Sequence, residues 1–442
     1  MTAPSDQRSP SGWRQHTTAG PVALLVGVLL LGIGLLYGRP DAALVGLPLV
    51  AFAVMGSTSP GSPPVEVRVL DLPTSGAPAD LAPGSVPFEL VPTAPPDADL
   101  VVLRVSLRGD VPQHLVVLPG RPLRGCVVPV HSGPQQLVSA SAWLVAHDGS
   151  EVDGPSQRAV LEAVVAAAPV PLGQLPHSPR PRGLSGGHDA ARPGKGGAFR
   201  DIGRFAPGDR LRSVDWKVTA RRAQFDGDLF VRRTTATADA TVVVAVDSRD
   251  DVGARVSGWA AGGTASDGPT SLDLARRAAV SLVTATIRDG DRAGFLDLGT
   301  DGRDVPAGAG HRHLQRLVTA IAGTQATGIS ARPARTARLP ADALVHLIAT
   351  FLDETPADAA RAWLARGHRV VAVVVLPPAD LTGATEEVRL AHRVVTGETA
   401  ARLAELRSAG ADVVRWQAAG SDQPLAVQLH AVSRRRTRAP RP

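Results

Sequence analysis

The sequence has almost no cysteine and few aromatic residues. Cys126 is the single cysteine among 442 residues, and aromatic side chains make up 3% of the chain. One cysteine excludes disulfide bonds within the chain and zinc sites built from several thiolates. The sequence also contains no His-Glu-x-x-His motif of zinc proteases, no dinucleotide-binding glycine fingerprint and no phosphate-binding P-loop. We therefore expect a protein that is not an enzyme and that holds no cofactor.

The excess of basic residues is small for a chain of this length. Lysine and arginine together number 47 against 41 acidic residues, which gives a formal net charge of +6. Arginine replaces lysine almost throughout, a bias typical of GC-rich genomes that raises the isoelectric point without indicating a basic function. Apart from Trp216 and Phe225, the basic segments lack interleaved aromatic residues that stack on bases, so we do not expect nucleic-acid binding.

Two apolar runs near the N-terminus indicate a membrane anchor. After a polar tail over residues 1–16, which we expect to be disordered, residues 17–38 carry no charged side chain. A helix of that length can cross the hydrocarbon core of a bilayer. A polar turn and a shorter apolar run follow, so we predict an N-terminal two-helix transmembrane hairpin over residues 17–57. A cleaved signal peptide and a buried helical hairpin are the alternatives.

The distribution of arginine around the hairpin predicts its orientation in the cell membrane. Arg8 and Arg14 precede the first apolar run, whereas the turn between the two runs contains Arg39. Because basic residues favour the cytoplasmic side, we expect the tail and the bulk of the chain to be cytosolic.

Two regions with different periodicities follow the hairpin. Residues 65–171 contain short alternating runs separated by proline and glycine, which predicts an antiparallel β-sandwich-like domain. Residues 172–198 are rich in proline, glycine and arginine, and we expect a linker. From residue 240 to residue 433 strand-like and helix-like patterns alternate, which predicts a doubly wound, mostly parallel α/β domain. Residues 434–442 form a basic tail.

A densely charged segment, residues 199–233, separates the predicted linker from the α/β domain. Between Lys195 and Arg233 there are ten basic and five acidic residues, so this stretch carries +5 of the net charge of +6. Such a density of charge suits a fixed polar network in which Asp209 and Asp215 accept hydrogen bonds from arginines and Trp216 offers its flat face to a guanidinium. A solvated, charge-mixed connector is the alternative.

The same segment resembles the signature of the domain of unknown function 58 family, membrane-anchored bacterial proteins with a von Willebrand factor type A-like domain. In that signature an arginine and an aromatic residue precede Pro-Gly-Asp, and Asp-Trp-Lys and Ala-Arg follow. The matching residues are Arg204, Phe205, Pro207, Gly208, Asp209, Arg212, Asp215, Trp216, Lys217, Ala220 and Arg221. The resemblance implies a type A-like fold for the C-terminal domain. It also implies a non-enzymatic adaptor that works with a MoxR-type AAA+ ATPase in envelope or complex maturation.

Acidic residues at two predicted strand ends are candidate metal ligands. Asp247 ends the first strand of the α/β domain and Asp353 follows a later strand, and carboxylates in such positions can hold Mg²⁺. The type A resemblance implies Asp-x-Ser-x-Ser here, but Arg249 and Asp251 stand where the two serines would be. The charge of Arg249 opposes Mg²⁺ by Coulomb repulsion, and Asp251, a third candidate ligand, would offset this charge only in part. We therefore expect no metal, and expect Asp247 to cap the strand end or to pair with Arg249.

These features together predict a membrane-anchored adaptor that binds protein partners through a type A-like domain. Two alternatives remain open. One is a Mg²⁺-dependent ligand-binding or adhesion module, and the other is a protein that binds nucleic acid or anionic lipid through its arginine-rich segments.

Overall fold

The computed structural model describes residues 14–16, 18–56, 65–72, 84–94, 100–145, 151–173, 175–176, 188–207, 209–225, 227–238, 240–261, 268–299, 304–327, 339–416 and 425–434. The chain forms two compact units. The first contains residues 1–129 and 135–163, and the second contains residues 130–134 and 164–442. The chain therefore passes between the two units three times.

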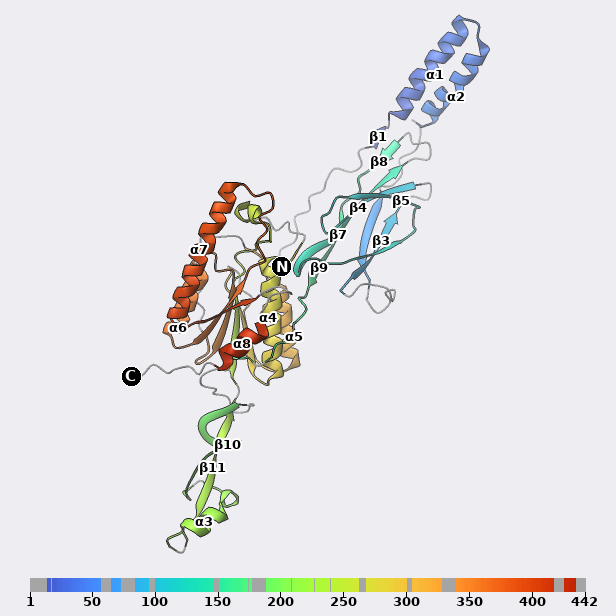
Figure 1. The fold of residues 1–442 in the computed structure, drawn as a ribbon. Helices are drawn as coiled ribbons and strands as arrows, with labels where there is room; N and C mark the ends of the chain where they lie inside the picture. The colour runs from blue at the N-terminus through green and yellow to red at the C-terminus, as the bar shows by residue number, and fades with distance from the viewer. Residues whose placement is uncertain are drawn as a thin grey trace. The chain divides into compact units, whose positions relative to one another are not determined.

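Two apolar helices that pack closely against each other belong to the first unit. Helix α1 spans Ala19–Leu36 and helix α2 spans Pro40–Gly56 (Figure 1). Of the described helices, α1 alone is long and apolar enough to cross a membrane, and α2 is shorter. Glycine permits the close packing, because a Cβ added to Gly46 would lie 2.6 Å from the carbonyl oxygen of Gly27.

Two antiparallel sheets make up the rest of the first unit. The order of one sheet is β1-β8-β7-β4-β5, with β9 also paired to β7, and the order of the other is β2-β3-β6. The strands are β1 (Arg14–His16), β2 (Glu66–Asp71), β3 (Val86–Thr93), β4 (Leu100–Leu107), β5 (Gln113–Val117), β6 (Leu123–Val127), β7 (Gly133–Val145), β8 (Glu151–Asp153) and β9 (Ala159–Val165). Apolar side chains from both sheets, Leu90 and Leu103 among them, form one hydrophobic cluster.

The expectation of a disordered N-terminal tail is wrong for its last three residues. Residues 14–16 form β1, which pairs antiparallel with β8. A polar sequence can still form a strand at the edge of a sheet, because the pairing uses backbone groups and one face remains in water. Residues 1–13 of the predicted tail lie outside the described residues.

A six-stranded sheet is the centre of the second unit. Its order is β14-β13-β12-β15-β16-β17, and all neighbours are parallel except β13 and the edge strand β14. The strands are β12 (Thr241–Val246), β13 (Arg292–Asp297), β14 (Val305–Gly308), β15 (Leu344–Ala349), β16 (Arg369–Val375) and β17 (Asp412–Trp416). The central strands are continuous apolar runs, because helices cover both of their faces.

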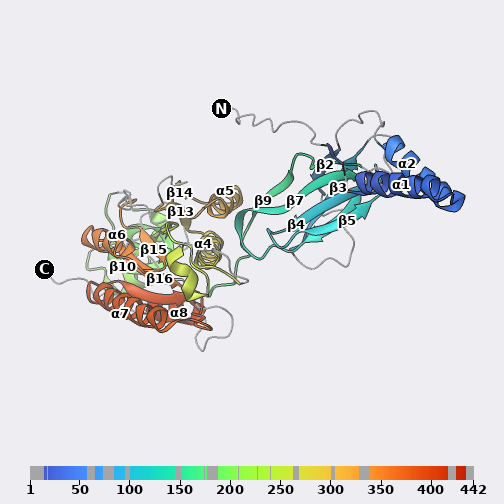
Figure 2. The same ribbon diagram turned by 90° about the horizontal axis from the view of Figure 1, so that it is seen from above.

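The helices divide between the two faces of this sheet (Figures 1 and 2). Helices α4 (Ser271–Arg288), α5 (His311–Ala322) and α8 (Leu425–Arg434) pack on one face, and α6 (Thr355–Ala365) and α7 (Glu386–Ser408) pack on the other. The predicted α/β alternation is therefore present. The sequence pattern predicts the helix now labelled α7 only from Glu398, because its buried residues begin at Thr399 and its first turns lie in solvent.

A separate two-stranded antiparallel sheet contains the two ends of the densely charged segment, and the rest of the segment connects its strands. Strand β10 (His188–Arg204) pairs with β11 (Phe230–Ala238), and the short helices η2 (Leu211–Ser213) and α3 (Trp216–Arg222) lie between them in the chain. The expectation of a linker over residues 172–198 is therefore wrong from His188 onward. Three register shifts interrupt the pairing of β10 with β11, so the sequence keeps no two-residue alternation that would predict the strand.

The imidazole of His346 is fully buried in the middle of β15. Val244 and Val371 lie opposite it in the two neighbouring strands, and neither ring nitrogen has a hydrogen-bond partner among the described residues. Burial, together with the positive charge of Arg369, lowers the pKa of His346 to about 3. The ring is therefore neutral in the folded protein at neutral pH.

We expect the close approach of α1 and α2 to depend on Gly46. A Gly46→Val substitution places two methyl groups against the backbone of α1, and overpacking of this kind typically costs about 1–3 kcal/mol. Gly32→Val on α1 is the matched control, because nothing lies within 4 Å of a Cβ added there. Thermal unfolding of the full-length protein in mild detergent measures the effect. Equal unfolding temperatures for the two variants would contradict the packing described.

We expect His346 to make the protein less stable in acid. Between pH about 6.5 and pH about 3 the unfolded chain binds a proton at this histidine and the folded chain does not, so stability falls by up to ~1.4 kcal/mol per pH unit as the pH drops. His346→Leu should flatten this part of the stability curve, and the exposed control His311→Leu should leave it unchanged. Urea unfolding at several pH values measures the slope. An unaltered slope in His346→Leu would refute the assignment.

Candidate functional site

The carboxyl ends of β12 and β15 meet where the order of the sheet reverses. Strand β13 follows β12 in the chain and lies on one side of it, and β15 lies on the other side. Ligands of open α/β sheets bind at such a switch point. Asp247 follows β12 directly and Asp353 lies in the loop after β15, so the fold brings these two sequence-predicted carboxylates together.

The guanidinium of Arg249 fills the space between the two carboxylates. Its Nε and Nη2 donate to the two oxygens of Asp247 at 2.9 and 2.8 Å, and its Nη1 and Nη2 donate to Asp353 at 2.9 and 3.0 Å. Nη1 also donates to Thr355 Oγ1 at 3.0 Å. The side chain of Arg249 is only 4% exposed. The predicted pairing of Asp247 with Arg249 is thus present, and Asp353 extends it to a second carboxylate.

The charges of this cluster stabilise the protonated arginine. Burial alone would lower the pKa of Arg249, but hydrogen bonds and charge interactions with Asp247 and Asp353 outweigh it and raise the pKa above its ordinary value. Burial raises the pKa of the neighbouring Asp250, and the negative charges of Asp247 and Asp353 raise it further. The protein therefore supplies its own permanent cation to a group of carboxylates.

The loop after β15 is held in a conformation that directs Asp353 toward Arg249. Phe351 in this loop is fully buried and has a φ of 57°, a left-handed backbone that costs of order 1–3 kcal/mol in a residue with a side chain. Arg402 holds the loop, since it donates to the Phe351 carbonyl and to the Glu354 carboxylate, each at 2.7 Å. Asp353 in turn accepts from the backbone N–H of Thr355 at the start of α6.

Asp297 is a third strand-end carboxylate that the sequence analysis did not single out. It ends β13, and Ser248 Oγ donates to its Oδ1 at 2.5 Å. Burial raises the pKa of Asp297. A signal was available in the sequence, because Asp297 ends a strand and comes just before a turn, as Asp247 does.

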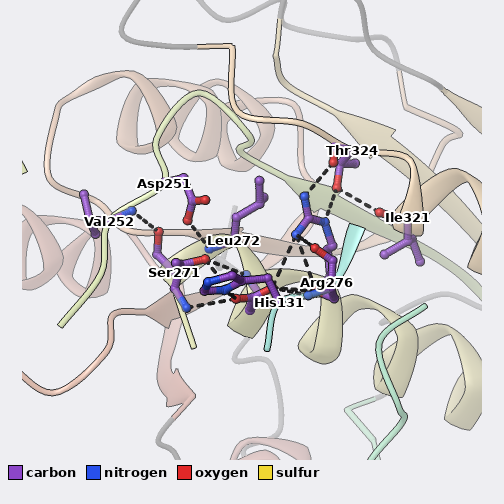
Figure 3. A network of polar contacts seen from close by, with 11 residues as sticks. His131, Asp251, Val252, Ser271, Leu272, Arg276, Ile321 and Thr324 are labelled. Atoms are coloured by element: carbon purple, nitrogen blue, oxygen red, sulfur yellow. Dashed lines mark hydrogen bonds and ion pairs between the residues drawn. The ribbon is translucent and has the colours of Figure 1, made fainter. Parts of the chain in front are cut away.

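The third metal candidate, Asp251, does not join the cluster of Asp247 and Asp353. Its Oδ1 accepts from the backbone N–H of Leu272 at 3.1 Å, and the neighbouring Val252 N–H donates to Ser271 Oγ, so both residues fix the start of α4 (Figure 3). Within the described part of the chain, no group of three or more histidine, cysteine or acidic side chains is arranged to hold a metal ion.

A second buried polar cluster surrounds Asp273 in the first turn of α4, and Figure 3 labels two of its members, His131 and Arg276. This carboxylate accepts from His131 Nδ1 at 2.7 Å and from the backbone N–H of Ser132 at 2.6 Å, and it completes a capping box with Thr270. Arg276 donates to the carbonyl oxygen of Ser132 at 2.8 Å. Burial would raise the pKa of Asp273, but hydrogen bonds, first that from His131, lower it to about 2. Sequence patterns could not find this cluster, because its parts lie about 140 residues apart.

Two signature residues, Asp209 and Asp215, make hydrogen bonds within the hairpin formed by β10, β11 and the segment between them. Asp209 accepts from the backbone N–H of Ala206 at 3.0 Å and from Arg233 Nη2 at 3.1 Å, and these two contacts, in that order, lower its pKa. The expected arginine partner of Asp215 is not found among the described residues, because this carboxylate caps α3 through the N–H of Val218. Gly208 lies outside the described residues.

The remaining signature residues are mostly on the surface of the hairpin. Trp216 is exposed, and the cation–π pair described in this segment joins Arg232 to Phe199 at 5.4 Å instead. The other exposed members are Arg204, Phe205, Pro207, Arg212, Lys217, Ala220 and Arg221. The signature therefore contributes a few internal contacts and a large exposed surface.

The fold and this site define an α/β protein with a mostly parallel sheet, whose switch point is closed by an internal ion cluster. Residues 201–384 match the model of the family described as "Protein of unknown function DUF58", and this match supports the resemblance of the charged segment to that family. The matched range includes α3, the switch point and β16. No curated protein and no solved structure matches the chain.

We expect Arg249→Met to destabilise the protein strongly at neutral pH. The substitution leaves Asp247 buried and Asp353 beside it without their cation, and loss of one partner of a buried pair typically costs about 3–5 kcal/mol. Arg361→Met is the control, because Arg361 pairs with Glu354 and Asp358 at the surface, where such pairs contribute about 1 kcal/mol or less. Urea unfolding measures both. Equal losses would show that the buried cluster has no special role.

We also expect Arg249→Ser to create a requirement for a divalent cation. The substitution removes the guanidinium from between Asp247 and Asp353 and adds a hydroxyl oxygen, which suits Mg²⁺. Millimolar Mg²⁺ should recover part of the lost stability in this variant, and should have no such effect on the unaltered protein or on the double variant Asp247→Asn/Arg249→Ser. Calorimetry and unfolding with and without Mg²⁺ measure this. Identical Mg²⁺ effects in all three proteins would contradict the expectation.

Proposed function

We propose that this protein is a membrane-anchored, non-enzymatic adaptor whose C-terminal unit has a von Willebrand factor type A-like fold and binds protein partners. The pairing of Arg249 with Asp247 and Asp353 is the observation that carries the proposal. A switch point usually accepts a small ligand or a metal ion. Here a buried side chain of the protein takes that place, which favours a role in binding over a role in catalysis.

The N-terminal helices support the membrane part of the proposal. Helix α1 is long and apolar enough to cross a bilayer, and the contact of Gly27 with Gly46 is the small-residue packing common between membrane helices. We propose that α2 is the second span, and that the arginines before α1 keep the bulk of the chain on the cytosolic side of the cell membrane.

The proposed partner is a MoxR-type AAA+ ATPase, in envelope or complex maturation. The support is the resemblance carried by the signature residues, together with the match of residues 201–384 to the DUF58 family. A non-enzymatic adaptor has no energy source of its own, and an ATPase partner would supply energy through ATP hydrolysis. The Mg²⁺-dependent adhesion alternative has less support, because Arg249 already satisfies the carboxylates that such a module would offer to the metal.

Isolation of the tagged full-length protein from its native membrane in mild detergent tests the proposal. We expect an AAA+ ATPase to co-purify, and we expect protease added to spheroplasts to leave the C-terminal unit intact until the membrane is opened. The same tag on the two N-terminal helices alone is the control for non-specific capture. Absence of the ATPase, or digestion of the C-terminal unit in intact spheroplasts, would count against the adaptor or its placement respectively.

A further inference from the structure

The hairpin of β10 and β11 exposes several large apolar side chains. Trp216 is 64% exposed, Phe225 74%, Leu211 66% and Phe199 53%. Single exposed apolar residues are common, but a concentration of them marks an interaction site. A two-stranded sheet is also only marginally stable in water on its own. Both facts indicate that this element functions while covered by something else.

Three acidic residues of the hairpin are used for internal contacts. Asp209 accepts from Ala206 and Arg233, Asp215 caps α3, and Asp228 accepts from the backbone N–H of Gln224. The exposed cations Arg210, Arg212, Lys217, Arg221 and Arg222 have no ion pair with any other described residue. The surface that remains is therefore strongly positive.

Helix α3 presents its aromatic ring and its cations on the same exposed side. Trp216 and Ala220 form one row at a spacing of four residues, and Lys217 and Arg221 form the adjacent row. Thr219 is buried, and its hydroxyl accepts from the backbone N–H of Phe230 in β11, so the side of α3 opposite to Lys217 and Arg221 faces the strand. Leu211 is likewise flanked by Arg210 and Arg212.

We propose that this hairpin surface docks a carboxylate-rich protein surface that has an apolar socket for Trp216. The inference rests on the proposed adaptor function, and it names the docking surface and the charge of the partner. Tryptophan and arginine are the residues most enriched at the energetic centres of protein interfaces. Their interleaving favours a protein over a bilayer, because helices that lie on membranes keep their apolar and charged residues on opposite faces.

Two short peptides of alternating sequence test the charge of the partner. One alternates glutamate with leucine and the other lysine with leucine, and fluorescence anisotropy measures their binding to the full-length protein in phosphatidylcholine nanodiscs. We expect the glutamate peptide to bind at least about tenfold more tightly, and its affinity to fall with added salt. Vesicles of phosphatidylcholine with about one third phosphatidylglycerol, and of phosphatidylcholine alone, form the membrane arm of the same experiment.

Matched charge-reversal variants locate the binding surface. Arg221→Glu/Arg222→Glu and, separately, Trp216→Ala should each weaken binding of the glutamate peptide about tenfold, as loss of central interface residues does. The control Arg389→Glu/Arg393→Glu makes the same charge change on the exposed face of α7 and should leave the affinity unchanged. Arg221→Lys/Arg222→Lys should retain most of the binding, and unfolding curves confirm that each variant is folded.

Three outcomes would overturn the inference. The first is equal affinity of the protein for the two peptides, and the second is an equal loss of peptide affinity in the hairpin variants and the α7 variant. The third is binding to the anionic vesicles that depends on the hairpin, with no preference between the peptides. That third result would make the hairpin a lipid-binding element. Co-purification of the ATPase by the Arg221→Glu/Arg222→Glu variant separates the two proposals. An ATPase that is retained when peptide binding is lost would leave the adaptor standing and remove the hairpin as its docking surface.

Discussion

The contact between Arg249 and two carboxylates decides what the open end of the sheet can do. Asp247 follows β12 and Asp353 lies in the loop after β15. Because these strands are parallel neighbours, their carboxyl ends lie at the same edge of the sheet, which brings the two negative charges close together. Such a group needs a positive charge to be stable in a buried position. Because the arginine is covalently part of the chain and does not lose its proton, the charge is always present and nothing from solution is needed.

This internal neutralisation is the reason that we propose a binding surface elsewhere in the protein. Hydrogen bonds hold the loops at this end of the sheet, since Arg402 donates to the carbonyl oxygen of Phe351 and Asp273 caps the start of α4. The hairpin of β10 and β11 has the opposite character, with few buried side chains and many exposed aromatic and basic ones. A rigid scaffold that carries an exposed recognition element is a common arrangement for proteins that bind other proteins.

Much of the second unit could be predicted, because buried parallel strands are continuous apolar runs and the helices between them are amphipathic. The positions of Asp247 and Asp353, each after the end of a buried strand, followed directly from this pattern. The edge strand β14 and the first half of α7 did not, since none of their side chains is fully buried and the periodicity is weak there. Strand β10 escaped prediction for a related reason, because its pairing with β11 is broken by bulges and leaves no regular alternation.

The sequence by itself determined the apolar N-terminal run, the alternation of buried strands and helices in the second unit, the charged signature and the presence of an arginine close to the first strand-end aspartate. These are local properties, fixed by which residues are neighbours in the chain. The tertiary structure alone decided three contacts. Arg249 donates to Asp353, about a hundred residues away, Asp251 accepts from the first turn of α4, and Asp273 accepts from His131. Each of those contacts depends on how distant segments of the chain pack, and the spacing of residues along the chain does not predict that packing.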